Sequence, residues 1–400
     1  MKICGVIAEY NPFHNGHAYH LAQTRANGAT HIVAVMSPNF VQRGAPAIAD
    51  KFVRAQCAVA GGVDLVLEMP TTYALSPAQL FAAGGIYLLD ALGCVDLLSF
   101  GSESGDIAEL RDIVHQLASP QFNLLIQQYS KEGVSYPRAH HMAVTKLYGE
   151  EFAESISSAN NTLAVEYLRA LDKASSPIRP MTVKRLFVEH DSSTSREEYA
   201  SASYLRQLLK YGSLRHIRPF VPDICYELLH KAQENQRAIA SLDRLEGPVL
   251  NQLRRMSQAD FAVLYDAEEG LDNRMMRAAR QAVSIQDFLS LVKTKRYTLS
   301  RLRRMMWCAF LGISKKDLVP PSYLRALAFN ERGLEILKVA KKTSRLPVVT
   351  KYAQVAKLGA EAVRLFSLHA RCTDLYALAL PTPFPCGMDM TYKTEILREN

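Results

Sequence analysis

The sequence contains no charge-free run of about eighteen apolar residues, so it predicts no membrane-spanning helix. The N-terminus reaches Glu9 after one short apolar stretch, which does not fit a signal peptide. The seven cysteines are scattered and form no CxxC pair, which argues against a zinc site or a disulfide framework. Repeats and low-complexity linkers are also missing. These absences lead us to expect a cytoplasmic protein with reduced thiols. The length of 400 residues favours two or three domains.

The net charge of +8 is unevenly distributed along the chain. Residues 1–150 carry 9 Lys and Arg against 12 Asp and Glu, a net charge of −3. Residues 221–400 carry 28 against 19, a net charge of +9. A basic second half favours a polyanionic partner such as nucleic acid, although a basic helical surface is often only a solvated face.

The first hundred residues alternate between buried strands and helices, which is typical of βαβ units in a parallel sheet. We expect strands at 3–8, 31–36, 63–69 and 95–100, and helices at 16–26, 50–60 and 77–92. One further strand is expected at 181–188, and little strand signal follows residue 221. The sequence therefore predicts an α/β fold. A Rossmann-like parallel-sheet domain over 1–220 would precede a mainly α-helical, basic domain over 221–400.

The turn after the first strand has the most unusual chemistry, because His14-Asn15-Gly16-His17 opens the following helix. Ligands of open parallel sheets bind beyond the carboxyl ends of the strands. The free N–H groups and the dipole of a first helical turn attract phosphate, and two imidazoles would donate to phosphate oxygens as charge builds. The alternative is an ordinary turn with incidental histidines.

This turn resembles the HxGH motif of the nucleotidyltransferase superfamily, which transfers AMP or CMP from a nucleoside triphosphate. That superfamily also has a later Ser/Thr-rich motif, ending in Arg or Lys, that grips the departing pyrophosphate. Its candidate here is "ASASYLRQLL", with Ser201, Ser203 and Arg206. An N-capped amphipathic helix would have the same pattern.

A closer resemblance covers nearly the whole chain. It rests on "GVIAEYNPFHNGHAYHL", "NFVQRGAPAIADKFVRA", "GVDLVLEMP", "FGSES", "SYPRA", "NNTLAVEYLRAL" and "KRYTLSRLRR", in this order. Together these segments are similar to the bacterial tRNA(Met) cytidine acetate ligase family. The resemblance implies ATP-dependent activation of acetate to acetyl-adenylate, followed by acetyl transfer to N4 of the wobble cytidine of elongator tRNA(Met).

The resemblance also implies site residues. His14, His17, Ser201, Ser203 and Arg206 would be catalytic, the histidines on the transferring phosphate and the others on the leaving group. The implied ATP-binding residues are Ile7, Ala8, Glu9, Tyr10, Asn11, Pro12, Phe13, His14, Asn15, Gly16, His17, Ala18, Tyr19, His20, Gly101, Asn161 and Arg185. Asn160 competes with Asn161, and His20 either lines the site or packs beside it. Mg²⁺ is expected with ATP, although no carboxylate cluster predicts a dedicated metal site.

One segment departs from the family pattern, because Ser37-Pro38-Asn39-Phe40 stands where a Ser-Gly-Asn-Phe form is expected. Pro38 has no N–H to donate, which leaves Asn39, Gln42 and Arg43 as candidate contacts there. For Glu9 we expect an orienting role rather than that of a general base.

The RNA contact is expected at "KTKRYTLSRLRR", a run without an acidic residue. Its cations would hold tRNA phosphates and its tyrosine would stack on a base. The predicted RNA-binding residues are Lys293, Lys295, Arg296, Tyr297, Arg301, Arg303 and Arg304. Far in sequence from the nucleotide motifs, they are expected to act in tRNA docking and not in acetate activation. A basic helix face around an apolar stripe is the alternative, and "KVAKKTSRL" is a weaker second patch.

The sequence leaves two rival functions open. An adenylyltransferase acting on a phosphorylated small metabolite would explain the histidines equally well, but gives the basic second half no purpose. A non-catalytic RNA-binding protein would explain the charge but not the intact His14, Gly16, His17 and Arg206. Neither a membrane nor a protein partner is predicted.

Overall fold

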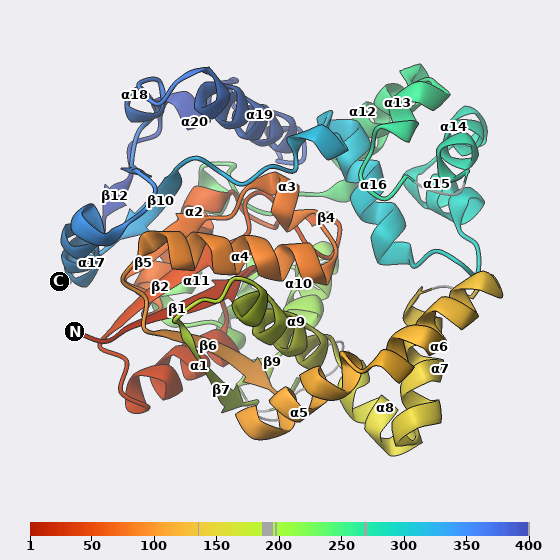
Figure 1. The fold of residues 1–400 in the computed structure, drawn as a ribbon. Coiled ribbons are helices and arrows are strands. Elements are labelled where there is room, and N and C mark those ends of the chain that lie inside the picture. Colours follow the sequence, from red (N-terminus) through yellow and green to blue (C-terminus); the bar gives the residue numbers. More distant parts are fainter. Residues whose placement is uncertain (135, 186–194, 197, 268–269, 399–400) are drawn as a thin grey trace.

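A largely parallel sheet forms the centre of the computed structural model, which describes residues 1–134, 136–185, 195–196, 198–267 and 270–398 (Figure 1). Its order is β11-β10-β5-β2-β1-β6-β7, and β12 pairs with β10. The strands from β5 to β7 in this order run parallel, whereas β10 is antiparallel to β5. Their bounds are β1 (Ile3–Ala8), β2 (His31–Met36), β5 (Leu65–Glu68), β6 (Leu97–Ser102), β7 (Arg179–Lys184), β10 (Leu324–Phe329), β11 (Val348–Val349) and β12 (Glu395–Ile396).

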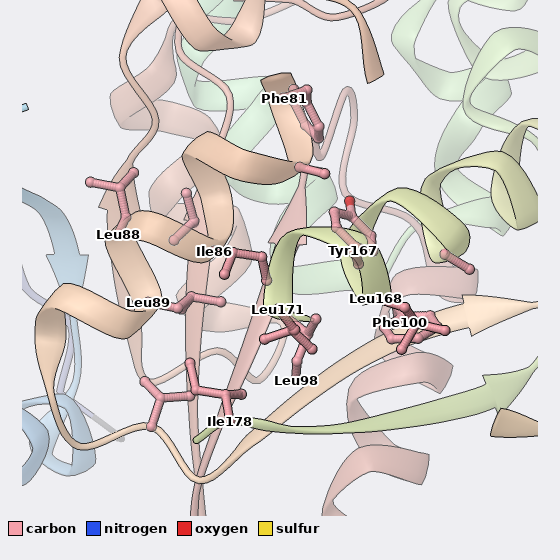
Figure 2. Close-up of a cluster of buried hydrophobic side chains, with 14 of the residues drawn as sticks. Phe81, Ile86, Leu88, Leu89, Leu98, Phe100, Tyr167, Leu168, Leu171 and Ile178 are labelled. Atoms are coloured by element: carbon pink, nitrogen blue, oxygen red, sulfur yellow. The ribbon is translucent and has the colours of Figure 1, made fainter. Parts of the chain in front are cut away.

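Helices cover both faces of this sheet, which is why its central strands are continuous apolar runs. In β2, Val33 and Val35 face one hydrophobic cluster, and Ile32, Ala34 and Met36 face the other. Figure 2 shows part of the first cluster, where side chains of α4 and α9 meet Leu98 and Phe100 of β6. The helices that contribute to the two clusters include α1 (Asn15–Ala26), α2 (Lys51–Ala60), α4 (Ala78–Leu92), α9 (Ala159–Lys173), α10 (Ala202–Tyr211), α11 (Asp223–Glu234) and α17 (Glu331–Thr343).

Two groups of helices extend from the sheet (Figure 1). One follows β6 and consists of α5 (Ile107–Leu117), α6 (Pro120–Lys131), α7 (Tyr136–Tyr148) and α8 (Glu150–Ser157). The other has its own apolar core and consists of α12 (Leu242–Arg255), α13 (Gln258–Ala262), α14 (Leu271–Gln281), α15 (Ile285–Val292) and α16 (Leu299–Leu311). The remaining elements are β3 (Phe40–Val41), β4 (Ala45–Pro46), α3 (Thr71–Ala74), β8 (Ser195–Arg196), β9 (Tyr199–Ala200), the 3₁₀ helices η1 (Leu214–Phe220) and η2 (Lys315–Asp317), α18 (Tyr352–Val355), the long helix α19 (Ala360–Ala377) and α20 (Met388–Thr391).

The strands and helices expected in the first hundred residues are confirmed, with the strand ends within two residues of their predicted positions. Helix α2 starts where its cap predicts, because Asp50 accepts hydrogen bonds from the backbone N–H groups of Phe52 and Val53 at 2.9 and 3.1 Å. The strand expected at 181–188 is β7, which ends at Lys184. Residues 186–188 of that prediction lie outside the described residues.

The expectation of little strand after residue 221 needs correction. Strands β10, β11 and β12 all come from that half and join the sheet of the first half. The run "LRALAF" of β10 is short and rich in Ala and Leu, which favour helix, and it contains Arg325. Its strand conformation is decided by pairing with β5, which local sequence does not reveal.

A buried group of four charges ties this returning strand to the first half of the chain. The Lys51 ammonium lies 2.6 Å from both the Glu68 and Asp389 carboxylates. The Arg325 guanidinium lies 3.0 Å from Glu68 and also pairs with Asp389. Two cations and two anions therefore neutralise one another where β5, α2, β10 and α20 meet.

Across the described part of the chain, no helix combines the length and the apolar character that crossing a bilayer requires.

Candidate active site at the carboxyl ends of the strands

A cavity of about 550 Å³ opens beyond the carboxyl ends of β1 and β6. From the turn after β1 it is lined by Glu9, Tyr10, Asn11, His14, Gly16, His17, Tyr19 and His20. Its other lining residues include Gln42, Arg43, Gly101, Asn160, Tyr167, Arg185, Ser201, Ser203, Arg206, Ser300, Arg303 and Arg304. The two sequence motifs, which lie almost two hundred residues apart, therefore meet at one cavity.

The two histidines of the first motif form a stacked pair at the start of α1. Their ring centroids are 3.7 Å apart with an interplanar angle of 25°. The His17 Nδ1 accepts the backbone N–H of His14 at 3.2 Å, so a neutral His17 carries its proton on Nε2. Tyr10 packs edge-on against the His17 ring at 4.9 Å between centroids. His17 thus caps the helix with one nitrogen and has the other as a donor.

Gly16 and Asn15 have structural roles in this turn. A Cβ on Gly16 would lie 3.0 Å from the His14 Cε1, so glycine leaves room for that ring. The Asn15 amide donates to the backbone carbonyls of Glu198 and Pro219 at 3.0 and 3.1 Å. Asn15 therefore fastens the turn to the segments on either side of the second motif.

The second motif contributes the Arg206 guanidinium, which contacts the histidine turn of the first motif. Arg206 donates to the carbonyl of Asn11 at 2.9 Å and to the Ser203 hydroxyl at 3.1 Å. Arg43, from the turn between β3 and β4, reaches the same hydroxyl at 3.4 Å. Ser201 caps α10 by accepting the Tyr204 N–H at 3.0 Å, so the capping interpretation also holds. Two cations and Ser203 converge beside the histidine turn, as an anion site requires.

The third group of predicted contacts surrounds the end of β6. The Arg185 guanidinium donates to the side-chain Oδ1 of Asn160 at 3.1 Å, and the Asn160 Nδ2 donates to the Glu103 carboxylate at 2.9 Å. A Cβ on Gly101 would lie 3.3 Å from the Arg185 Cγ, so glycine admits this arginine. Asn161 is buried and accepts the backbone N–H of Glu103 at 3.2 Å. Asn160, and not the predicted Asn161, therefore lines the cavity, while Asn161 holds the loop after β6.

His20 lines the cavity in the neutral form. Its Nε2 lies 2.9 Å from the Ser99 hydroxyl, which in turn lies 2.7 Å from the Thr24 hydroxyl. Burial, aided by the charge of Arg185, lowers the pKa of His20 from 6.5 to about 4. His20 therefore positions Ser99 and adds no positive charge near neutral pH.

We expect the buried histidines to make stability depend on pH. Burial lowers the pKa of His369 to about 4 as well. At pH values between about 4 and the ordinary pKa of 6.5, these two histidines are protonated in the unfolded chain but neutral in the folded chain. The free energy of unfolding should therefore fall as the pH is lowered through that window. Urea titrations at several pH values check this, and His20→Asn should flatten the dependence. An equally steep dependence in that variant would contradict the assignment.

Four residues of the predicted nucleotide segment do not line the cavity: Pro12, Phe13, Asn15 and Ala18. Phe13 is buried, and its ring fills the space that a side chain at Gly61 would need. Of the candidates after Pro38, Gln42 and Arg43 line the cavity. The buried Asn39 instead accepts the backbone N–H of Lys51 at 2.7 Å and donates to Thr373.

The basic run is divided by the structure. Tyr297 is only 6% exposed and has the Arg301 guanidinium 5.2 Å from its ring centroid, so it offers no face to an RNA base. Arg301 donates to the carbonyl of Asp266 at 2.7 Å, and Lys293 donates to the carbonyl of Tyr297. The burial of Tyr297 therefore corrects the expectation that it stacks on a base, and the other predicted RNA contacts stay predictions.

Arg303 and Arg304 line the cavity, which also corrects the expected separation from the nucleotide motifs. Helix α16 carries them there because it packs on the β3–β4 hairpin, where the Trp307 Nε1 donates to the carbonyl of Gly44 at 2.9 Å. Lys295 and Arg296 remain exposed on the segment before α16.

Arg54 is a site residue that the sequence analysis missed. Buried in α2, its guanidinium donates to the carbonyls of Glu9 at 2.6 Å, Ala49 at 3.0 Å and Ser37 at 3.0 Å, and also to that of Pro38. It thereby holds together the ends of β1 and β2. The sequence feature that could have revealed its role is a single arginine in the middle of an otherwise apolar face of helix α2.

The described residues contain no group of three His, Cys, Asp or Glu side chains able to hold a metal ion. Among the described residues that line the cavity, Glu9 is the one carboxylate. This donor set fits a cation that enters bound to phosphates better than one held by the protein.

Comparisons with known proteins agree with this geometry. The family model described as HIGH Nucleotidyl Transferase matches residues 1–386. The tRNA(Met) cytidine acetate ligase of Thermoanaerobacter sp. (strain X514) is 38% identical over 399 residues, covering 98% of this chain and 99% of that protein. The protein of the same name from Caldanaerobacter subterraneus subsp. tengcongensis is 38% identical over 386 residues, covering 95% and 96%.

Two crystal structures of Thermotoga maritima TmcAL share the fold over the full length of both chains. The apo form has a TM-score of 0.94 at 33% identity. The form bound with alpha-thio ATP has a TM-score of 0.92 at 32% identity. The chain therefore belongs to the HIGH nucleotidyl transferase family and, within it, to the tRNA(Met) cytidine acetate ligases.

Proposed function

We propose that this protein is an ATP-dependent acetate ligase that forms acetyl-adenylate and acetylates N4 of the wobble cytidine of elongator tRNA(Met). The observation that carries the proposal is the stacked His14–His17 pair, which shares one cavity with Ser203 and Arg206. Relatives that match nearly the whole chain bear the same name, and a structural neighbour binds an ATP analogue.

In the first step, an acetate oxygen attacks the α-phosphorus of ATP and pyrophosphate leaves with the electrons of the broken P–O bond. The His14 and His17 imidazoles donate to the α-phosphate oxygens as negative charge builds there, and Arg206 with Ser203 stabilises the leaving pyrophosphate. Arg43 joins this second group, because it reaches the same Ser203 hydroxyl. A protein nucleophile is not needed, since positioning and charge stabilisation carry the chemistry.

In the second step, the cytidine N4 attacks the acetyl carbonyl carbon. The bond to AMP breaks, AMP leaves, and the amino group loses a proton.

We propose that Mg²⁺ enters with ATP, bound to the phosphates of the nucleotide. Glu9 would orient polar groups beside it. Within the nucleotide pocket we assign the contact to Asn160 together with Arg185 and Gly101.

We propose that the two expected regions have different functions although their strands share one sheet. Residues 1–220 would carry most of the nucleotide site, and residues 221–400 would dock tRNA while supplying Ser300, Arg303 and Arg304 to the cavity. The reduced thiols and a tRNA substrate fit a protein that works in the cytoplasm.

Replacing Lys295 and Arg296 with glutamine should weaken tRNA binding and spare acetate activation. Both side chains are exposed and lie outside the cavity lining. Each lost phosphate contact should reduce the log–log salt slope of tRNA binding by about 0.7 to 0.9. Arg303→Gln is the contrasting variant, since it should impair both tRNA binding and acetate activation. An unchanged salt slope in the double variant would make this segment merely a solvated surface.

The proposed activity is tested by exchange of labelled pyrophosphate into ATP without tRNA. The expected result is exchange that depends on acetate. An adenylyltransferase would instead need a phosphorylated metabolite and leave AMP in its product, and a non-catalytic RNA-binding protein would show neither exchange nor ATP binding.

A further inference from the structure

Helix α10 leads from the cavity to an exposed aromatic side chain. Ser203 and Arg206 near its start line the cavity, and Tyr211 is its last residue. At 1.5 Å per residue, Arg206 and Tyr211 are about 8 Å apart along the helix axis. Tyr211 is 77% exposed, and the Lys210 ammonium lies 5.3 Å from its ring centroid. A large ring this exposed covers no core, and a cation stands beside it.

The surroundings of Tyr211 are uniformly basic in sequence. Residues 199–222 contain Arg206, Lys210, Arg215 and Arg218 and no acidic residue. The 3₁₀ helix η1, which packs against α10, presents Arg215 and Arg218 on the surface. Arg218 also faces Asp223 at 3.5 Å and Glu227 at 4.0 Å, so we leave it out of the proposed contact. Lys210, Tyr211 and Arg215 then form what we call the α10 tip.

The cavity lies between the α10 segment and another acid-free segment. Residues 288–316 also contain no acidic residue, and they supply Ser300, Arg303 and Arg304 to the cavity lining. Residues 199–222 supply Ser201, Ser203 and Arg206. An RNA whose target base enters the cavity therefore meets basic protein on two sides.

We propose that the α10 tip is a second RNA-contact surface, on which Lys210 and Arg215 hold the phosphate backbone and Tyr211 stacks on an unpaired base. RNA would then straddle the cavity, with one part on the α10 tip and another on the segment before α16. Sequence-tolerant recognition of single-stranded loops combines cations that follow the backbone with aromatic rings on which bases stack. The inference rests on the proposed function, because it assumes an RNA substrate.

The test measures tRNA binding as a function of salt for three variants of the full chain. For Lys210→Gln/Arg215→Gln we expect the log–log slope to fall by about 0.7 to 0.9 for each of two contacts. Tyr211→Ala should bind about five- to a hundredfold more weakly at fixed salt, from the loss of one stacked base. Tyr211→Phe keeps the ring and should bind as the wild type does.

The control removes the same charge elsewhere. Lys351→Gln/Lys357→Gln changes two exposed lysines beside α18, which lies apart from α10 (Figure 1). This variant should keep the wild-type affinity and slope, and the α10-tip variants should keep wild-type pyrophosphate exchange, because none of the three residues lines the cavity.

The outcomes separate the two proposals. If the wild type acetylates tRNA but the α10-tip variants bind it with unchanged affinity and slope, the second surface is refuted and the function stands. Equal weakening by the α18 control would also refute it, since the effect would then follow net charge alone. If the wild type neither binds nor acetylates tRNA, both proposals fail.

Discussion

Replacing His17 with alanine is expected to slow acetyl-adenylate formation by about a hundred- to a thousandfold. The imidazole stacks on His14 at the start of α1, and a neutral ring carries its proton on Nε2 because Nδ1 accepts the backbone N–H of His14. In the proposed mechanism, the imidazole is already positioned where negative charge develops on the α-phosphate in the transition state. Its removal therefore lowers the rate of adenylate formation. His14→Ala should have a similar effect. Acetate-dependent pyrophosphate exchange measures both.

The control must separate lost chemistry from a lost helix cap. His17 caps α1, so its removal should cost about 1 kcal/mol of stability, which a urea titration detects. His230→Ala changes an exposed histidine of α11 and should leave exchange unchanged. Near-normal exchange in the His17 variant would remove the proposed mechanism.

The second large effect is on stability, and we expect it from Asp389→Ala. This change leaves Lys51 and Arg325 buried with Glu68 alone to neutralise them. Breaking a buried ion pair by removing one partner destabilises by about 3–5 kcal/mol, because the remaining charge is uncompensated. The midpoint of urea unfolding should therefore fall markedly. Asp172→Ala breaks the exposed pair with Arg111 and should change stability by under about 1 kcal/mol.

The sign of the pH dependence follows from the same group. Burial alone would raise the pKa of Asp389, but Arg325 and Lys51 together hold it below its ordinary value of 3.8. A carboxylate with a depressed pKa stabilises the fold above that ordinary value and loses its contribution as the pH falls through the folded pKa. The Asp389 variant should therefore lose less stability on acidification than the wild type. Equal unfolding midpoints for variant and wild type would contradict the role of this charge group.

The first part of the site was predictable because its information is local. A buried strand, a turn with two histidines and a glycine, and a helix lie within about twenty-five residues, and the structure brings them together as expected. Asn160 and Asn161 were not separable in this way. Neighbours on a helix point about 100° apart, and only the position of Glu103 decides which amide faces the cavity.

The basic run was misjudged for a different reason. Arg303 lies far along the chain from the histidine turn, but α16 packs on the β3–β4 hairpin and carries that arginine to the cavity. Tyr297 looked like a stacking residue and is buried, while Tyr211, in an acid-free segment of its own, is exposed. Charge runs are readable from sequence, but which residues of a run face solvent depends on tertiary packing.

The most direct test of the proposed activity is to supply the protein with ATP, labelled acetate and total tRNA, and then to digest the RNA to nucleosides. We expect label in N4-acetylcytidine derived from elongator tRNA(Met), one free AMP for each acetyl group transferred, and no label without ATP. Label in another nucleoside, AMP retained in the product, or tRNA without label while ATP is bound would contradict it.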